Sequence, residues 1–290
     1  MSQSFGGDWT QEKLARVGKY LNAYTHILSK KNFRFAYIDA FAGTGYNEIK
    51  DDDDQNQPMF QELTELEPQR FREGSASIAL KTQPPFQTYI FIERDTRRFQ
   101  ELQVLKDNHL NLDIRLKNAD ANTFLIDLCR DSSWKAHRAV IFLDPFGMQV
   151  NWETIRAIAD TKAVDLWYLF PLGIGVNRLL KRDGNIKPQW RTRLDEIFGD
   201  GDWYDEFYKP SPQTQLSLFD EEPAQSSKVV KTANWDAISA YLVQRLKTVF
   251  AHVAENPLQL YNSRRVPLYL LCFASTNATA VKIAKDVLKP

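Results

Sequence analysis

The sequence has few of the residues and patterns that mark secreted, metal-binding or membrane proteins. It contains only two cysteines, Cys129 and Cys272, each inside an apolar stretch, and four histidines without metal-ligand spacing. We interpret both cysteines as reduced core residues and expect neither a disulfide nor a metal site. No apolar run approaches the ~18 residues of a membrane span, and the N-terminus has no signal-peptide pattern. These absences predict a cytoplasmic protein that does not enter a membrane.

Charge of one sign is also lacking. The 290 residues carry 37 basic and 37 acidic side chains, so the net charge is zero. A neutral chain has no overall field that would attract nucleic acid. Any nucleic-acid binding must therefore come from a local patch.

What is present is an alternation of apolar runs and amphipathic segments. The apolar runs are nearly continuous, which is typical of strands buried on both faces of a parallel sheet; they lie at 35–38, 88–92, 112–116, 139–143, 164–170 and 268–275. Helical segments lie between them, at 75–80, 96–108, 122–129 and 152–160. A leading amphipathic helix is predicted over 9–30, with Lys13 off its apolar side. The pattern predicts an α/β fold: a doubly wound, mostly parallel, Rossmann-like sheet with a leading helix and helical insertions.

Two segments interrupt this alternation within what we interpret as a single domain, 1–290. A polar loop insertion at 46–73 contains four consecutive aspartates, and Ser75 after it is a candidate helix N-cap. A helical insertion at 176–250 is predicted to contain helices at 176–198 and 233–250 and a flexible segment at 210–227, rich in Pro, Gln, Ser and acidic residues.

The first chemical motif follows the first predicted strand. An acidic residue and a glycine turn end this strand; the candidate cofactor-binding residues are Asp39, Ala40, Phe41, Gly43 and Gly45. Glycine allows a backbone to approach a bound cofactor closely. The alternative for the motif taken alone is a buried strand followed by a tight turn.

Later strand ends add further acidic residues. Glu93, after the second strand, is placed to accept hydrogen bonds from ribose hydroxyls; alternatively it is a surface carboxylate paired with a nearby arginine. Asp120 and Ala121, after the third strand, are candidates for contact with adenine, although Asp120 could equally be a helix N-cap. Because the carboxyl ends of parallel strands meet at one edge of a sheet, these residues can converge. Their order suggests a methyl-donor site.

The fourth strand ends in Asp144-Pro145-Phe146-Gly147. Here a carboxylate can orient an acceptor amine and an aromatic ring can stack on its base. We take Asp144, Pro145 and Phe146 as candidate catalytic residues. The alternative is a β-turn with proline at its second position.

The chain resembles the three-Cys-motif partner protein family (TcmP) over nearly its whole length. The resemblance is carried by the motifs at 37–45, 74–75, 91–93, 143–147, 165–171 and 273–275. It implies a class I methyltransferase-like fold, which agrees with the S-adenosylmethionine site that we infer from the strand ends. It also implies a partner protein with a three-cysteine motif, and genes often carried by phage or mobile elements.

The fourth-strand motif is also similar to the D-P-P-[YF] box of methyltransferases that act on the amino group of adenine. Here the second proline is absent and the aromatic residue comes one position earlier. A slip of one residue reverses the direction of a side chain in an extended segment.

Two classes of function remain open. One is a methyltransferase that acts on an amino nitrogen, with nucleic acid as a candidate acceptor. Candidate substrate-binding residues in the insertion are Arg178, Lys181, Trp190 and Arg191; alternatively, they belong to a solvated amphipathic helix. The other class is a non-catalytic or regulatory partner protein that keeps the fold. A nicotinamide-dependent dehydrogenase is disfavoured because the full G-x-G-x-x-G spacing is absent.

Overall fold

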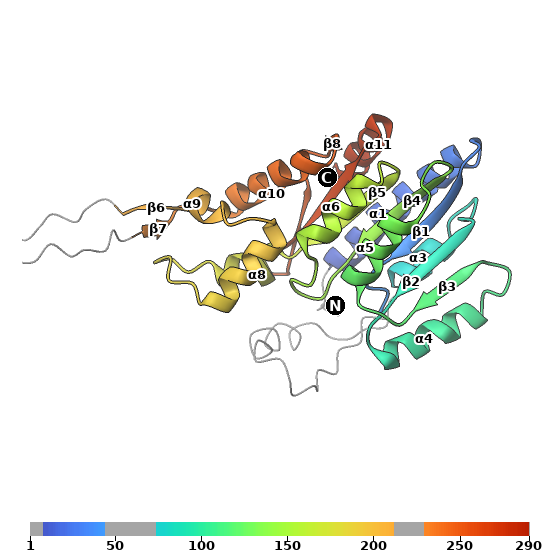
Figure 1. The fold of residues 1–290 in the computed structure, drawn as a ribbon, viewed down its shortest axis with the longest axis horizontal. Helices are drawn as coiled ribbons and strands as arrows, with labels where there is room; N and C mark the ends of the chain where they lie inside the picture. The colour runs from blue at the N-terminus through green and yellow to red at the C-terminus, as the bar shows by residue number, and fades with distance from the viewer. Residues whose placement is uncertain (1–7, 44–73, 212–228, 290) are drawn as a thin grey trace, which may run out of the picture.

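The computed structural model describes residues 8–43, 74–211 and 229–289. The predicted insertion at 46–73 and Gly45 lie outside these residues. Within them, an eight-stranded sheet has the order β3-β2-β1-β4-β5-β10-β8, with β9 paired to β10 (Figure 1). Its strands are β1 Arg34–Asp39, β2 Thr88–Ile92, β3 Ile114–Lys117, β4 His137–Leu143, β5 Val164–Phe170, β8 His252–Val253, β9 Leu258–Tyr261 and β10 Pro267–Ser275.

The strand order indicates at which edge of the sheet a ligand is expected to bind. Strands β1 to β5 are mutually parallel, and β10 runs antiparallel to β5. The chain first builds outward from β1 to β3 and then returns to add β4 on the other side of β1. Such a reversal opens a crevice at the carboxyl ends of the strands, where ligands bind in doubly wound sheets. The predicted α/β, mostly parallel, Rossmann-like fold is confirmed.

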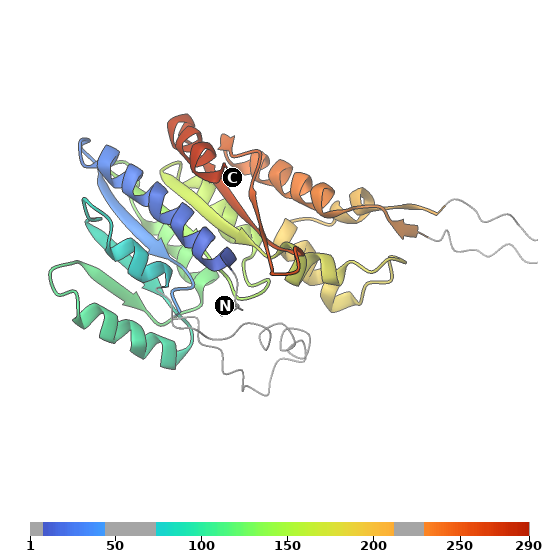
Figure 2. The ribbon, with the colours of Figure 1, turned by 180° about the vertical axis from the view of Figure 1, so that it is seen from behind.

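Helices cover both faces of the sheet (Figures 1 and 2). On one face lie α1 Asp8–Leu28, α3 Ser75–Leu80, α4 Thr96–Asp107 and α11 Ala278–Leu288, which share one hydrophobic core with the strands. The other face is covered by α5 Ala121–Asp131 and α6 Trp152–Asp160, with a second core. Because the central strands are buried on both faces, their sequences are continuously apolar, as expected for parallel strands.

The insertion forms an arm that projects beyond the sheet (Figure 1). It comprises the π-helix Leu172–Val176, α7 Asn177–Leu179, α8 Pro188–Phe198, α9 Trp203–Phe207, the ribbon of β6 Tyr208–Pro210 and β7 Val229–Lys231, and α10 Trp235–Val249. The predicted continuous helix at 176–198 is wrong. Gly184 has a φ of 72° and Pro188 begins α8, so the chain turns between α7 and α8. Of the predicted flexible segment, Pro210 ends β6, and 212–227 lie outside the described residues.

Both cysteines are buried and unpaired with each other, Cys129 on α5 and Cys272 on β10. Burial raises the pKa of the Cys129 thiol to about 12. In the described ranges, no cluster of His, Cys, Asp and Glu could hold a metal ion, and no helix is long and apolar enough to span a membrane.

A buried carboxylate attaches α1 to the sheet. Asp165, at the start of β5, accepts hydrogen bonds from Tyr20 on α1 (2.6 Å) and from Ser275 at the end of β10 (2.5 Å). Burial raises the pKa of Asp165 to about 6, against the two hydrogen bonds that lower it. Asp165 thus joins α1, β5 and β10, and its burial in the folded protein favours the protonated form of the carboxyl group.

We expect Asp165→Asn to change the pH dependence of stability. The folded-state pKa of Asp165 lies above the ordinary 3.8. Protonation of Asp165 therefore stabilises the folded wild-type protein fully below about pH 4, and this stabilisation is lost as the pH rises through about 6. The free energy of unfolding of Asp165→Asn, relative to wild type, should therefore rise between pH 4 and pH 7.5 by up to about 3 kcal/mol. Urea denaturation at several pH values measures it. Asp113→Asn is the control, because Arg115 lowers the pKa of Asp113 and the trend should have the opposite sign; a difference independent of pH at Asp165 would contradict the prediction.

Candidate functional site

The chain that leaves β1 crosses the carboxyl edge between its two neighbours. The amide of Ala40 donates to the carbonyl of Phe142 on β4 (3.1 Å), and the amide of Ala42 donates to the carbonyl of Ile92 on β2 (3.0 Å). These bonds hold the first turn in the crevice made by the reversal of strand order. Phe41 is half-buried beside it.

Glu93 lies directly against this turn. A Cβ atom at Gly43 would be 2.5 Å from Oε2 of Glu93 and 2.9 Å from Cδ of Arg98, so a larger residue here would push these two side chains away from the turn. The other oxygen of Glu93 accepts from the amide of Asp95 (2.7 Å). Burial raises the pKa of Glu93, and the Asp95 amide and the Arg98 charge oppose this rise. The structure thus brings together Gly43 and Glu93, which are distant in sequence.

Asp39 is fully buried, below the surface of the crevice. Its carboxylate accepts from the amide of Phe41 (3.3 Å) and from the hydroxyls of Tyr37 (3.4 Å) and Ser75. Burial raises the pKa of Asp39 to about 7; Asp144 adds to the rise, and Lys13 lowers it. Ser75 is the first residue of α3, with Gly74 as the N-cap, so its predicted capping role is wrong. Asp39 therefore connects the first turn to α3.

Asp120 caps α5. Its Oδ1 accepts from the amide and the hydroxyl of Thr123 (3.0 and 3.1 Å), and Ala121 begins the helix with its side chain buried. The N-cap alternative considered for Asp120 is thus present. Contact of Asp120 and Ala121 with adenine stays a prediction.

Asp144 forms an ion pair that the sequence did not predict. Nζ of Lys13 lies 2.5 Å from Oδ2 of Asp144, with side chains only 6% and 20% exposed. The ammonium also lies over the rings of Trp9 (5.3 Å) and Phe142 (5.9 Å). Lys13 comes from α1, where it was expected off the apolar side of the helix. The leading helix thus supplies a buried cation to the end of β4.

The turn after Asp144 presents an aromatic ring. Pro145 is buried, Phe146 is 39% exposed, and Gly147 has a φ of 68°, in the left-handed region that glycine adopts without strain. The following loop is held by Asn122, whose Oδ1 accepts from the amide of Asn151 (3.0 Å) and whose Nδ2 donates to the carbonyl of Gln149 (2.9 Å). The bend at 146–148 leaves Phe146 at the surface, and the β-turn alternative for 144–147 stays a prediction.

The basic residues of the arm gather around two aromatic clusters. Nζ of Lys181 lies 5.0 Å, and that of Lys187 4.9 Å, from the centre of the Trp190 ring. The guanidinium of Arg191 lies 4.4 Å from the ring of Tyr204. Arg178, on α7, is partly buried. Lys181 lies in the turn before α8, and Trp190 and Arg191 lie on α8. Arg193 of the same helix donates to Asn151 (2.7 Å) and to the carbonyl of Val150 (3.3 Å), so α8 contacts the loop that follows the fourth-strand motif.

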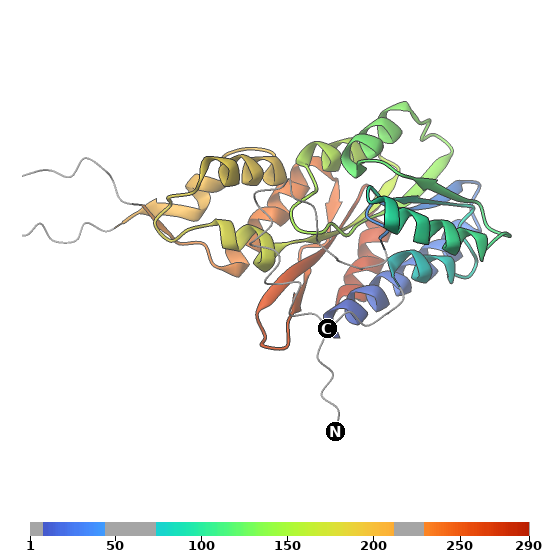
Figure 3. The same cartoon turned by 90° about the horizontal axis from the view of Figure 1, so that it is seen from below.

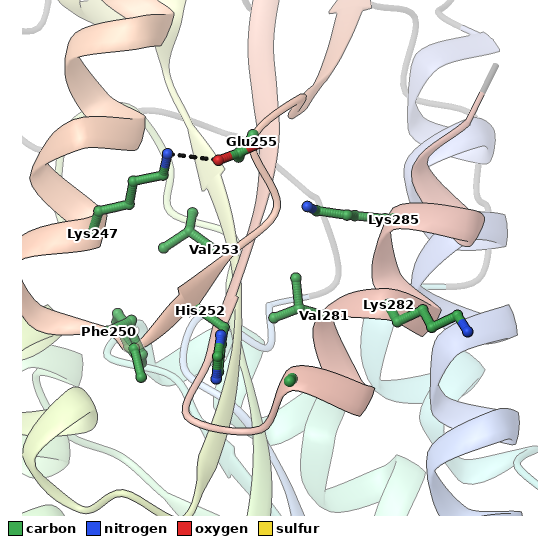
Figure 4. A pocket seen from close by; sticks show the side chains of 10 residues that line it. Lys247, Phe250, His252, Val253, Glu255, Val281, Lys282 and Lys285 are labelled. Atoms are coloured by element: carbon green, nitrogen blue, oxygen red, sulfur yellow. Dashed lines mark hydrogen bonds and ion pairs between the residues drawn. The ribbon is translucent and has the colours of Figure 1, made fainter.

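A separate groove of about 560 Å³ lies between the end of α10, β8 and α11 (Figure 4). Lys247, Lys282 and Lys285 line it, and Glu255 pairs with Lys247 at 2.7 Å. Because β10 is antiparallel to β5 and β8 pairs with its last residues, this groove is at the amino ends of the parallel strands. It is therefore distinct from the crevice.

No family model matches the chain, and no curated protein matches it. Among similar solved structures is LPL1258 from Legionella pneumophila str. Philadelphia 1, with 13% identity and a TM-score of 0.48 over 98% of this chain and 92% of that one. An S-adenosylmethionine-dependent methyltransferase from Clostridium acetobutylicum ATCC 824 has 13% identity and a TM-score of 0.37, over 89% and 92%. The bifunctional kinase-methyltransferase WbdD has 8% identity and a TM-score of 0.41, over 91% and 39%.

Proposed function

We propose that this protein is an S-adenosylmethionine-dependent methyltransferase that acts on an amino nitrogen. The observation that carries the proposal is the approach of Gly43 to the Glu93 carboxylate in the crevice, with Asp144 at the end of the neighbouring strand β4. A glycine turn and an acid on adjacent strands are the elements by which doubly wound folds hold the nucleoside part of a cofactor.

The residues present suit this cofactor. The space that a Cβ at Gly43 would fill is bordered by Glu93, which can accept hydrogen bonds from ribose hydroxyls. Ala40, Phe41 and Gly43 supply the turn, Asp39 holds it from below, and Asp120 and Ala121 are assigned to the adenine. When bound, the cofactor supplies an electrophilic methyl group.

Asp144 is assigned to the acceptor. Its carboxylate can accept hydrogen bonds from the amino N–H groups and so orient the nitrogen, while Lys13 holds Oδ2 and keeps a positive charge beside it. Phe146, exposed at the same turn, can stack on a planar acceptor, and Pro145 restricts the backbone between them. Catalysis by these groups would rest mainly on positioning.

The proposal includes a partner with a three-cysteine motif, on the strength of the resemblance alone. The second candidate function, a non-catalytic partner that retains the fold, is favoured by the burial of Asp39 and by the Asp144–Lys13 pair, which already satisfies one carboxylate oxygen. Transfer of a radiolabelled methyl group to nucleic acid or protein, measured with and without the partner, separates the two.

We expect Glu93→Ala to weaken cofactor binding by about 1.5–3 kcal/mol, roughly tenfold to a hundredfold, because hydrogen bonds to a charged acceptor are lost. Calorimetry with S-adenosylmethionine and with S-adenosylhomocysteine measures the affinity. Glu101→Ala, an exposed acid on the next helix, is the matched control and should bind as wild type. If wild type binds neither compound at millimolar concentration, the cofactor assignment is wrong.

We expect charge reversal of Arg178, Lys181 and Arg191 to reduce both nucleic-acid binding and its dependence on salt, because phosphate contacts release counterions. Gel-shift assays over a series of salt concentrations measure both. Reversal of three exposed basic residues elsewhere, Arg130, Lys135 and Arg156, controls for total charge. Equal losses in both variants would mean that the arm has no specific contact with phosphate.

A further inference from the structure

The hairpin of β9 and β10 extends beyond the carboxyl edge of the sheet (Figure 3). Its base is fixed by Leu270 of β10, which pairs with Phe170, the last residue of β5. Residues before Leu270 therefore lie past the end of β5, on the same edge as Asp144. The backbone carbonyl of Pro267 lies against Gly173, where a Cβ would come within 1.9 Å, so the hairpin is anchored to the π-helix after β5.

Contacts connect the hairpin to the acceptor end of the crevice. The ring of Tyr269 lies 4.8 Å from that of Trp9, and Trp9 in turn lies under the Lys13 ammonium that pairs with Asp144. Arg265 is four residues from Tyr269, a span of about 13 Å in extended chain. That reach corresponds to a few nucleotides of a single strand.

The tip of the hairpin is a hydrogen-bonded turn that presents two arginines. Oδ1 of Asn262 accepts from the amides of Arg264 (3.0 Å) and Val266 (2.9 Å). Arg265 has a φ of 57°, in the left-handed region that glycine occupies without strain. The turn therefore places Arg264 and Arg265 at the tip of the hairpin, where both side chains are exposed.

The hairpin segment itself carries basic residues and no acidic ones. No acidic residue occurs between Glu255 and Asp286, in a chain with 37 acidic side chains among 290 residues. In the described part of the chain, neither Arg264 nor Arg265 takes part in an ion pair, and both are exposed. Tyr261, 44% exposed, lies at the same tip and offers an aromatic ring. Two unpaired guanidinium groups beside an exposed ring suit phosphates and an unstacked base.

We propose that the tip of this hairpin, residues 261–266, binds the sugar-phosphate backbone of a single-stranded nucleic acid and guides it to Asp144. The proposal rests on the methyltransferase function for the position of the acceptor, and it names nucleic acid as the acceptor class. Arg264 and Arg265 contact phosphates, and Tyr261 stacks on a base next to the one that enters the crevice.

The test compares two double variants of the full chain. Arg264→Ala with Arg265→Asn removes both charges, and asparagine tolerates the left-handed backbone at 265. Lys282→Ala with Lys285→Ala removes two charges from the groove at the opposite edge of the sheet (Figure 4). Fluorescence anisotropy with a labelled single-stranded RNA, a DNA duplex and anionic phospholipid vesicles is measured over a series of salt concentrations.

We expect the hairpin variant to bind single-stranded RNA about tenfold more weakly at low salt, with a salt slope lower by about 1.4, which corresponds to two lost contacts; the lysine variant should keep the wild-type slope. Four outcomes would each overturn the proposal: equal losses in the two variants, unchanged binding by the hairpin variant, no binding of RNA by wild type, or hairpin-dependent binding to vesicles alone. Because the assay requires neither cofactor nor turnover, absence of methyl transfer with hairpin-dependent RNA binding would contradict the proposed activity and leave this surface standing.

Discussion

Asp144→Asn protein is expected to bind S-adenosylmethionine within a few-fold of wild type while losing methyl transfer by about 10²-fold or more, the effect of misplacing a reacting group. The carboxylate follows β4, whereas Glu93 and the glycine turn lie between β1 and β2. Asparagine keeps the shape of the side chain but removes its charge and turns one acceptor into a donor. Transfer is measured with radiolabelled methyl groups on total nucleic acid and on protein, with the three-cysteine partner present and absent.

A matched control is available at the neighbouring strand end. Asp120→Asn also replaces an acid by its amide at the carboxyl edge, and asparagine caps helices as well as aspartate does. Its transfer rate should fall much less than that of Asp144→Asn. Equal transfer by wild type and Asp144→Asn would refute the assigned role, and absence of transfer in wild type despite cofactor binding would favour the non-catalytic partner.

Much of the fold could be predicted from the sequence because its central strands are buried on both faces. The runs at 88–92 and 164–170 match β2 and β5 residue for residue. Strands of a parallel sheet end at a common edge, so Asp39, Glu93 and Asp144 could be placed together from their positions after three such runs. The sequence therefore predicted the edge and the order of its residues.

Side-chain partners could not be predicted in the same way. Periodicity identifies the apolar stripe of α1, but Lys13 has the same chemistry as the solvated lysines around it, and only the packing of α1 over β4 buries it against Asp144. The short strands of the arm gave no strong pattern either. β6 and β7 have three residues each, and they pair although residues 211–228 separate them in the sequence. Tertiary contacts therefore decide their structure.

Removing the Asp144 carboxylate should also destabilise the protein, because it leaves the Lys13 ammonium nearly buried and without its ion-pair partner. We expect Asp144→Asn to lower the free energy of unfolding by about 2–3 kcal/mol, less than the 3–5 kcal/mol of a fully buried pair because the Asp144 side chain is 20% exposed. Lys13→Met should cost less, since the carboxylate it leaves can reach water. Urea denaturation of both single variants measures these changes.

The double variant Lys13→Met with Asp144→Asn decides whether the pair acts as a unit. With neither charge present, no buried ammonium is left unpaired, so the double variant should be more stable than the sum of the single changes predicts, by about 1–3 kcal/mol. The exposed pair Arg130–Asp127 on α5 is the control, and its cycle should give little or no coupling because water screens it. Additive changes at Lys13 and Asp144 would mean that the ion pair does not persist in solution, and α1 would then attach to the crevice through Trp9 and its apolar stripe alone. A coupled pair, together with reduced transfer and unchanged cofactor affinity in Lys13→Met, would make Lys13 a positioning residue for Asp144.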